Sequence, residues 1–226
     1  MRRWGIVIKV MDFLKRKHRV GRIQFQGQSI VEFTLLLPLL LMMLSGLIEF
    51  GFMLNEYLDL IDTTRETARY LSDRPPFSQG TDYNEDFYTG GISELYTTMQ
   101  RAGWIDLDPA VDDVIISVFS LTDWSTITRY PDQTDLNPDP RSECGVLNGG
   151  SLGWRYFCNK TTNFSDAEIR DRIDNASSIP PNNGLVLVEI FYHYHMRLGL
   201  PWITAFVGDT IELHAFSFAP NAYAEP

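Results

Sequence analysis

The chain has 226 residues, of which 44% are hydrophobic, and a formal net charge of −10. This length allows one domain with a sizeable core and a membrane segment, but is short for two full domains. Residues 1–27 carry eight Lys/Arg and one acid, a net of +7, which leaves −17 for the rest of the chain; a body that acidic repels phosphates and argues against a nucleic-acid-binding function.

A long apolar segment follows the basic N-terminal residues. No charged residue occurs between Phe33 and Ile48, and with its apolar flanks up to Leu54 the segment reaches about 25 residues. A helix of that length would extend about 37 Å, which exceeds the hydrocarbon thickness of about 30 Å. The sequence therefore predicts one transmembrane helix that contacts membrane lipid.

The flanking charges predict the orientation of this helix. Eight Lys/Arg precede it, whereas Glu56, Asp59 and Asp62 follow it. The positive-inside rule places the N-terminus in the cytoplasm and the residues from about 55 onward outside. We expect a single-pass protein of the cytoplasmic membrane, with its head on the extracytoplasmic side and possible display on a pilus or the cell surface.

A secretory signal peptide is an alternative interpretation of the same N-terminus. Its apolar region would be only about 7–15 residues long and would end in a small-residue cleavage site. In this chain Gly27 comes before the apolar run. The order of these features favours a membrane helix.

Glu32 is an acid near the cytoplasmic end of this apolar segment, where a carboxylate is a candidate functional group. If the chain were cut after Gly27, Gln28 would supply a new α-ammonium group. Glu32 would lie one helical turn from that amine, so the two charges could pair within one chain or between neighbouring subunits. The alternative is an interfacial acid at the end of an ordinary anchor helix.

The same segment resembles the TadE-like pseudopilins of the Tad (Flp) pilus system, which have a type IV prepilin-like N-terminus. The resemblance covers residues 26–71 and is carried by the features listed here: Gly27, Glu32 as the fifth residue after it, Phe33, Pro38, Gly46, Glu49, Gly51 and the "TTRETARY" at 63–70. The leader is longer and the acidic head larger than is usual, which leaves open a TadE-, TadF- or TadG-like subfamily.

The resemblance implies a processing site and a set of partners. A membrane aspartyl prepilin peptidase would cut between Gly27 and Gln28, and Glu32 with Phe33 would guide subunit docking. The implied partners are the prepilin peptidase, other pilins or pseudopilins, and the pilus assembly platform.

Pro38 lies inside the apolar run. It removes the hydrogen bond that its N–H would donate to the carbonyl of Thr34, and a proline at such a position tends to kink a helix. We predict a kink at this position.

The helix is predicted to continue outside the membrane and to end before "DRPPF" at 73–77. Apolar residues recur at helical spacing on one side, whereas Glu56, Asp59, Asp62, Arg65, Glu66 and Arg69 occupy the other. The predicted organisation is a leader at 1–27, one transmembrane and amphipathic helix at 28–72, and a head domain at 73–226.

The head is predicted to be α+β. One or two short helices interrupted by Gly90-Gly91 are expected within 83–101, and strands within 111–121, 184–197 and 210–218. Residues 123–183 resemble loops, with a short helix at 165–173 capped by Ser165 and Glu168. The strands would form a small antiparallel sheet against the long helix.

Two groups in the loop region are candidate stabilising or binding residues. A disulfide between Cys144 and Cys158 would close a short loop in an oxidising compartment; two reduced cysteines are the alternative. Asp135, Asn137 and Asp139 have the spacing that begins a calcium loop, with Asp132 nearby. The sixth and twelfth positions of such a loop are Pro140 and Val146, so solvated turns are the favoured interpretation.

No catalytic motif is found in the sequence, and His193, His195 and His214 are better explained as part of an aromatic sheet surface than as a zinc site. We therefore expect a protein that is not an enzyme and needs no metal or other cofactor. The predicted function is a pseudopilin that supports pilus assembly, adhesion or secretion. The alternatives are an uncleaved single-pass protein with a ligand-binding or envelope-anchoring head, and a calcium-regulated adhesin.

Overall fold

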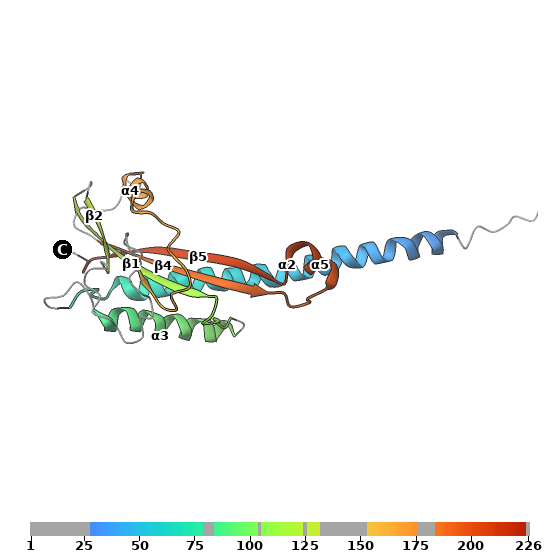
Figure 1. Ribbon diagram of the computed structural model, residues 1–226, viewed down its shortest axis with the longest axis horizontal. Helices are drawn as coiled ribbons and strands as arrows, with labels where there is room; N and C mark the ends of the chain where they lie inside the picture. Colours follow the sequence, from blue (N-terminus) through green and yellow to red (C-terminus); the bar gives the residue numbers. More distant parts are fainter. Residues whose placement is uncertain are drawn as a thin grey trace, which may run out of the picture. The chain divides into compact units, whose positions relative to one another are not determined.

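The computed structural model describes residues 28–78, 84–103, 105–123, 126–131, 153–175 and 184–224. The chain divides into two compact units, Met1–Ser45 and Gly46–Pro226. The described part of the first unit is the beginning of helix α2, which spans Gln28–Ser72. The second unit holds the rest of α2 and the whole α+β head (Figure 1).

The second unit is built around an antiparallel sheet. Its strands are β1 (Asp113–Asp123), β2 (Thr126–Tyr130), β3 (Trp154–Arg155), β4 (Gly184–His195) and β5 (Thr210–Asn221). The strand order is β2-β1-β4-β5, and the short β3 pairs with β1. The prediction of an α+β fold with a long N-terminal helix and a small antiparallel sheet is confirmed.

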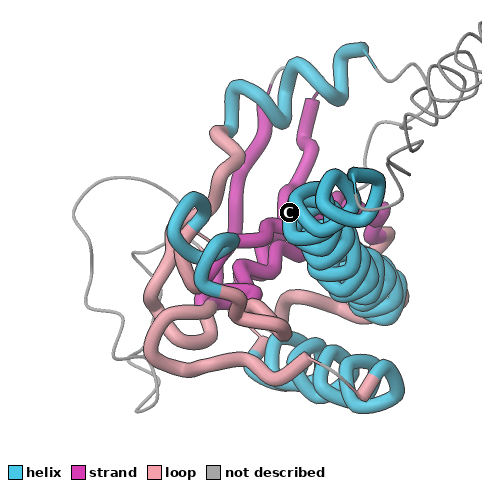
Figure 2. The backbone as a smooth tube through the Cα atoms, turned by 90° about the vertical axis from the view of Figure 1, so that its right-hand side faces the viewer, coloured by secondary structure: helices cyan, strands magenta, loops and turns pink. Residues whose placement is uncertain are grey.

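The two faces of the sheet have different partners. Alternate residues of β4 such as Val186, Val188 and Ile190 pack in one core with Leu60, Ala68 and Leu71 of α2 and with helix α3 (Glu85–Ala102). Leu185 and Leu187 point to the other face, where they pack with Ile169 of helix α4 (Asp166–Asn175). Figure 2 shows α4 across the strands from α2 and α3.

Helix α3 is continuous, so the predicted interruption at Gly90-Gly91 is wrong. Asn84 caps its start by accepting a hydrogen bond from the N–H of Asp86, and Gly103 ends it in the left-handed conformation. A Cβ built on Gly91 would lie 3.1 Å from Leu71 and 3.2 Å from Ile116. Gly91 is therefore not a helix breaker here, because its missing side chain allows α3 to approach α2 and the sheet.

Buried polar groups of the strands hold the segment 153–175 against the sheet. Asp113 accepts hydrogen bonds from the N–H groups of Phe157 and Lys160, each at 2.9 Å. Arg129 donates to Asp166 at 2.8 Å and to the carbonyl of Phe164 at 2.5 Å. This segment was expected to be mainly loops, and the structure shows that its backbone is pinned by charged side chains of the strands.

The predicted capping box of α4 is present. Ser165 and Glu168 exchange backbone-to-side-chain hydrogen bonds, with Glu168 accepting from the Ser165 N–H at 2.9 Å and donating its own N–H to Ser165 Oγ at 3.3 Å. Strands β2 and β3 lie in the stretch predicted to be loop-like, so the sequence did not predict them. Both are short and lack the long run of β-branched and other apolar residues that marks β1 and β4.

The C-terminal end of α2 is tied to the last residue of the sheet. Asn221 Nδ2 donates to the carbonyls of Leu71 at 2.8 Å and Arg74 at 2.9 Å. Leu71 lies in the last turn of α2, and its carbonyl also accepts from the Arg74 N–H at 3.2 Å, whereas Arg74 lies two residues beyond the helix. Asn221 therefore adds hydrogen bonds at the helix terminus and just after it, and joins the end of β5 to the end of α2.

Candidate functional site

The predicted processing and docking residues lie at the start of α2. Gly27 is outside the described residues, and Gln28 is the first described residue of α2. Glu32 and Phe33 are exposed, and Phe33 retains 59% of its accessible surface. The structure therefore places the proposed docking residues on the surface of the first unit, one turn into the helix.

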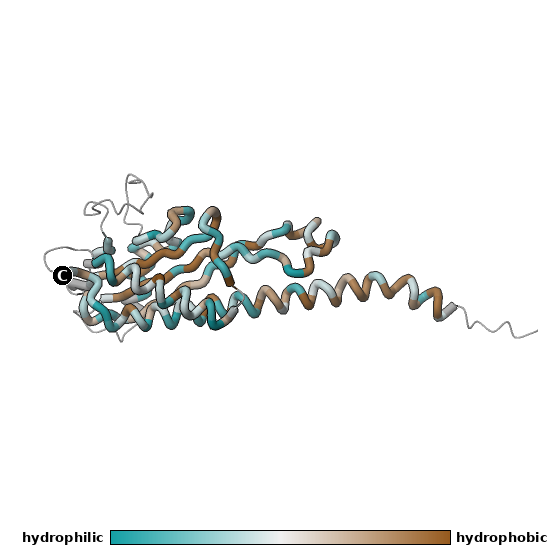
Figure 3. The backbone as a smooth tube through the Cα atoms, turned by 90° about the horizontal axis from the view of Figure 1, so that it is seen from below, coloured by the Kyte–Doolittle hydropathy of each residue, from teal (hydrophilic) through white to brown (hydrophobic). Residues whose placement is uncertain are grey.

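The first unit presents an apolar helix surface. Within α2, the stretch before the head is long and apolar enough to cross a membrane, and none of it is buried inside the protein. Residues 28–45 are accordingly coloured mostly hydrophobic in Figure 3. Pro38 lies inside this helix, which continues through it, and the kink stays a prediction.

Two acids of α2, Glu49 and Glu56, are buried in the second unit. They are seven residues apart, which is close to two helical turns, so both face the sheet. Glu49 Oε1 accepts hydrogen bonds from Tyr194 Oη at 2.5 Å and from the Arg197 N–H at 2.7 Å. Its other oxygen accepts from the Leu198 N–H at 2.8 Å.

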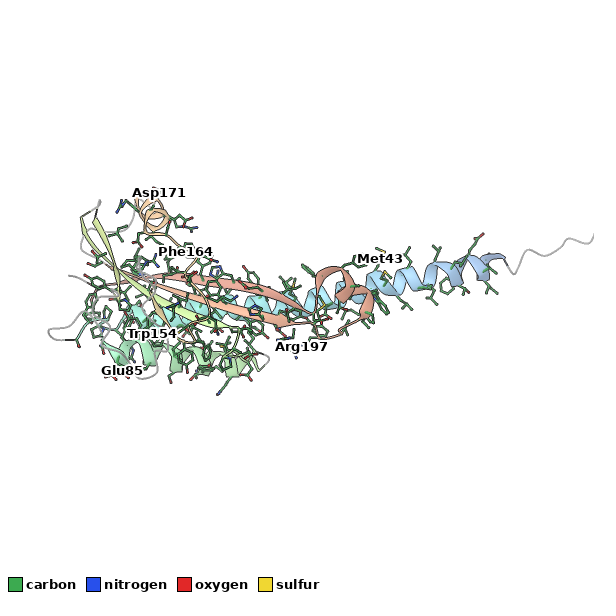
Figure 4. All side chains as sticks on the ribbon, in the orientation of Figure 1. Met43, Glu85, Trp154, Phe164, Asp171 and Arg197 are labelled. Atoms are coloured by element: carbon green, nitrogen blue, oxygen red, sulfur yellow. The ribbon has the colours of Figure 1, made fainter. Side chains whose placement is uncertain are left out.

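Glu56 binds the side chain of Arg197. Its Oε1 accepts hydrogen bonds from Arg197 Nη2 at 2.5 Å and Nε at 3.0 Å, and its Oε2 accepts from Tyr192 Oη at 3.1 Å. Arg197, labelled in Figure 4, follows the end of β4 and lies beside α2. We call the five residues Glu49, Glu56, Tyr192, Tyr194 and Arg197 the acid–tyrosine lock.

The electrostatics of the acid–tyrosine lock favour neutral tyrosines and a charged arginine. Burial, together with the nearby carboxylates that accept their hydrogen bonds, raises the pKa of Tyr192 and Tyr194 above the usual value. The hydrogen bonds to Glu56 are the main cause that raises the pKa of Arg197. The lock thus provides hydrogen-bond partners for carboxylates that would be costly to bury alone.

The expectation that Glu56 faces outward was wrong. The residues of α2 that face the sheet include Glu56 and the buried threonines Thr63, Thr64 and Thr67, whereas Leu54 and Leu58 are exposed. A rule that assigns charges to the solvent side fails here because Arg197 and Tyr192 supply partners from a distant strand. The spacing of Glu49 and Glu56 was the available signal, since acids seven residues apart share a helix face.

A groove adjoins the lock on the surface of the second unit. It has a volume of about 640 Å³ and is lined by Ile48, Gly51, Phe52, Asn55, Glu56 and Arg197. A Cβ built on Gly51 would meet no atom within 4 Å, so the groove is open at this position. Its mostly apolar walls, with the Glu56–Arg197 ion pair at one side, make it a candidate contact surface rather than a reaction centre.

Most of the remaining candidate residues fall outside the described part of the chain. Cys158 is disulfide-bonded, but its predicted partner Cys144 lies outside the described residues and the pairing stays a prediction. The calcium candidates Asp132, Asp135, Asn137 and Asp139 are also outside them. Among the residues that the structure describes, no group of three or more His, Cys, Asp or Glu is placed to hold a metal ion.

The histidines on the sheet contact acids. His193 Nδ1 lies 2.8 Å from Asp112 Oδ1, and His214 Nε2 lies 3.2 Å from Glu189 Oε1. The strand register opposes His214 to Phe191 rather than to His193. These contacts link the strands to each other and to neighbouring segments.

In the part of the chain that the structure describes, the architecture has one candidate membrane-spanning helix near the N-terminus and an α+β head packed on the continuation of that helix. The model of the family described as TadE-like protein matches residues 27–69, which confirms the resemblance expected from the sequence. No curated protein and no solved structure matches the chain. The matched segment contains Glu32, Pro38 and both acids of the acid–tyrosine lock.

Replacing Glu56 by glutamine tests the ion pair of the lock. Glu56→Gln keeps the shape but removes the negative charge that pairs with Arg197, and we expect the free energy of unfolding to fall by about 1–3 kcal/mol. The measurement is thermal or denaturant unfolding of the purified full chain in detergent. Glu66→Gln is the matched control, because Glu66 is an exposed acid on the same helix, 4.0 Å from Arg69, and surface pairs contribute about 0–1 kcal/mol. Equal effects of the two substitutions would contradict the lock.

The raised tyrosine pKa values predict a loss of stability at alkaline pH. The unfolded chain loses these protons near the ordinary tyrosine value of about 10, before the folded chain does. The stabilisation by Tyr192 and Tyr194 is therefore complete below about pH 10 and is lost as the pH rises further. In the Tyr192→Phe/Tyr194→Phe variant, the melting temperature should be lower at neutral pH but fall less steeply above about pH 10. A slope equal to that of the unaltered chain would show that these tyrosines do not titrate as proposed.

Proposed function

We propose that this chain is a membrane-inserted TadE-like pseudopilin that acts as a minor subunit or assembly component of a Tad (Flp) pilus, in adhesion or secretion. The observation that carries the proposal is the family match, which begins at Gly27, the residue before the proposed cut. The described part of α2 that follows, from Gln28 onward, is helical and apolar. Cleavage after Gly27 would leave a chain that begins with this segment.

The exposed apolar surface of residues 28–45 supports insertion in a membrane. In water such a surface would be unfavourable, whereas lipid chains or the helices of other subunits would cover it. Insertion with the basic leader in the cytoplasm follows from the positive-inside rule. The partners in this proposal are membrane lipid, the prepilin peptidase, other pilins or pseudopilins and the assembly platform.

Cleavage would change the electrostatics of the helix N-terminus. It removes the leader with its net charge of +7 and creates an ammonium group on Gln28. Glu32 follows four residues later, so its carboxylate lies on the same helix face one turn away. In a medium of low dielectric constant, the attraction between this acid and the amine of a neighbouring subunit would align the two helices.

The acid–tyrosine lock would serve this role by making the head rigid relative to residues 46–72 of α2. Glu49 and Glu56 bind the end of β4, and Asn221 at the end of β5 binds the C-terminal end of the helix. The sheet is therefore held at two places along the helix. The proposed role is structural and requires neither catalysis nor a cofactor.

Substitution of Gly27 by a bulky residue tests the processing step. Gly27→Leu should leave the chain uncut, because a leucine side chain would occupy the place of a hydrogen atom beside the cut bond. Intact-mass and N-terminal peptide analysis of protein from native membranes should find Gln28 first in the unaltered chain and Met1 first in the variant. Gly21→Leu is the control, because it makes the same change elsewhere in the leader and should not affect the cut.

Two results would overturn this processing assignment. One is an unaltered chain that still begins at Met1, which would favour the uncleaved membrane protein with a ligand-binding or envelope-anchoring head. The other is a Gly27→Leu product of mature size.

Substitution of Glu32 separates cleavage from assembly. Glu32→Ala should still be cut, but pilus number should fall at least about tenfold, as the loss of about 1.4 kcal/mol in a docking step would produce. Pilus counts by microscopy are compared at matched membrane levels of the protein. Glu66→Ala removes an exposed acid from the head portion of α2 and is the control. Normal pilus counts with Glu32→Ala would identify Glu32 as an ordinary interfacial acid.

A further inference from the structure

The connection between β4 and β5 carries an apolar surface that the core does not use. Residues 198–208 contain no charged residue, and within them helix α5 spans Pro201–Val207. None of the residues of α5 is buried. Phe206 is 88% exposed, Val207 is 55% exposed and Trp202 is 38% exposed. An exposed apolar surface of this kind is typical of a site that contacts a membrane or another molecule.

Hydrogen bonds fix the base of this connection. The Met196 N–H donates to the carbonyl of Asp209 at 3.2 Å, which brings the two ends of the segment together. At the same point, the N–H groups of Arg197 and Leu198 donate to Glu49 at 2.7 Å and 2.8 Å. The apolar segment is therefore attached to α2 at residue 49.

Residue 49 is also the place where the uncharged part of α2 ends. Glu49 is the first charged residue after Glu32, and no charge lies between them. At about 1.5 Å per residue, the intervening helix rises about 25 Å, close to the thickness of a hydrocarbon core. If that stretch lies in the membrane, Glu49 and the segment tied to it lie at the outer boundary of the bilayer.

We infer that α5 and its flanking residues 198–208 are a second membrane-contacting element, which inserts its apolar side chains into the outer leaflet at headgroup depth. The inference rests on the proposed membrane insertion of α2. Tryptophan beside phenylalanine and valine is typical of interfacial segments, where an aromatic ring contacts both lipid chains and headgroups. The charged residues Arg197 and Asp209 flank the segment and remain at its aqueous edge.

This contact would restrict the head to one orientation on the membrane. A single transmembrane helix allows the head to rotate about the helix axis and to tilt. A second contact at α5, attached through Glu49, limits both motions before assembly. The exposed side chains Ile48 and Phe52 of α2 lie near the same level and extend the apolar surface along the helix.

Fluorescence quenching by brominated lipids tests the contact in the full chain. The protein is reconstituted in phosphatidylcholine vesicles whose acyl chains carry bromine close to the headgroup or close to the chain end. The emission of Trp202 is obtained by subtracting the fluorescence of the Trp202→Phe variant from that of the unaltered chain. We expect bromine near the headgroup to reduce this difference about twofold or more, and bromine at the chain end to reduce it less, because tryptophan prefers the interface.

The control places a tryptophan at the other end of β5. Tyr223 is 57% exposed, and β5 extends about 40 Å from Thr210 to Asn221, so Tyr223→Trp in the Trp202→Phe background should show no quenching by either lipid. Figure 1 shows the C-terminal end of β5 far from α5 within the head. Quenching at both positions would indicate general adsorption of the head and would overturn the proposal.

Flotation of the same vesicles at alkaline pH reports insertion of α2 independently. A chain that fails to float with the vesicles overturns the membrane proposal together with this inference. A chain that floats but keeps its Trp202 emission in brominated lipid overturns the inference alone. Cross-linking of Phe206→Cys to a second copy, with no quenching of Trp202, would show that another subunit covers α5 instead of lipid.

Discussion

The burial of two carboxylates of α2 against the end of β4 is the interaction on which the rest of the head depends. A buried carboxylate is unfavourable unless several hydrogen bonds compensate for the lost water. Glu49 has three such bonds and Glu56 has three, all from the segment 192–198. These bonds require one register between helix and strand, because a shift of one residue would turn Tyr192 and Tyr194 to the other face.

Helix α2 has two different environments along its length. From Gly46 onward the helix belongs to the same compact unit as the sheet, and its inner face carries the lock, small residues and threonines. Residues 29–45 carry mostly apolar side chains, and each of them is partly or fully exposed. The division places the polar contacts of the helix within the head and leaves its apolar beginning available for lipid or for other helices.

The elements with a clear repeating pattern could be predicted from the sequence. Helix α2 followed from an unbroken apolar run and then helical spacing, strand β4 from its β-branched and aromatic residues, and the start of α4 from the pair Ser165 and Glu168. Strands β2 and β3 could not be predicted because they are short and owe their strand conformation to pairing with β1. Gly91 misled the prediction of α3, since a glycine in a helix is usually unfavourable and here makes room for Leu71.

The sequence by itself determined the distribution of charge, the candidate membrane helix and the resemblance at its N-terminus, because each depends on residues that are neighbours along the chain. Only the tertiary structure decided that Glu49 and Glu56 are buried and that Arg197 is their partner. These residues are more than 140 positions apart, and the energy of a buried charge depends on what surrounds it in space. The same reason applies to α5, because only the hydrogen bond from the Leu198 N–H to Glu49 shows that this apolar segment is attached to α2.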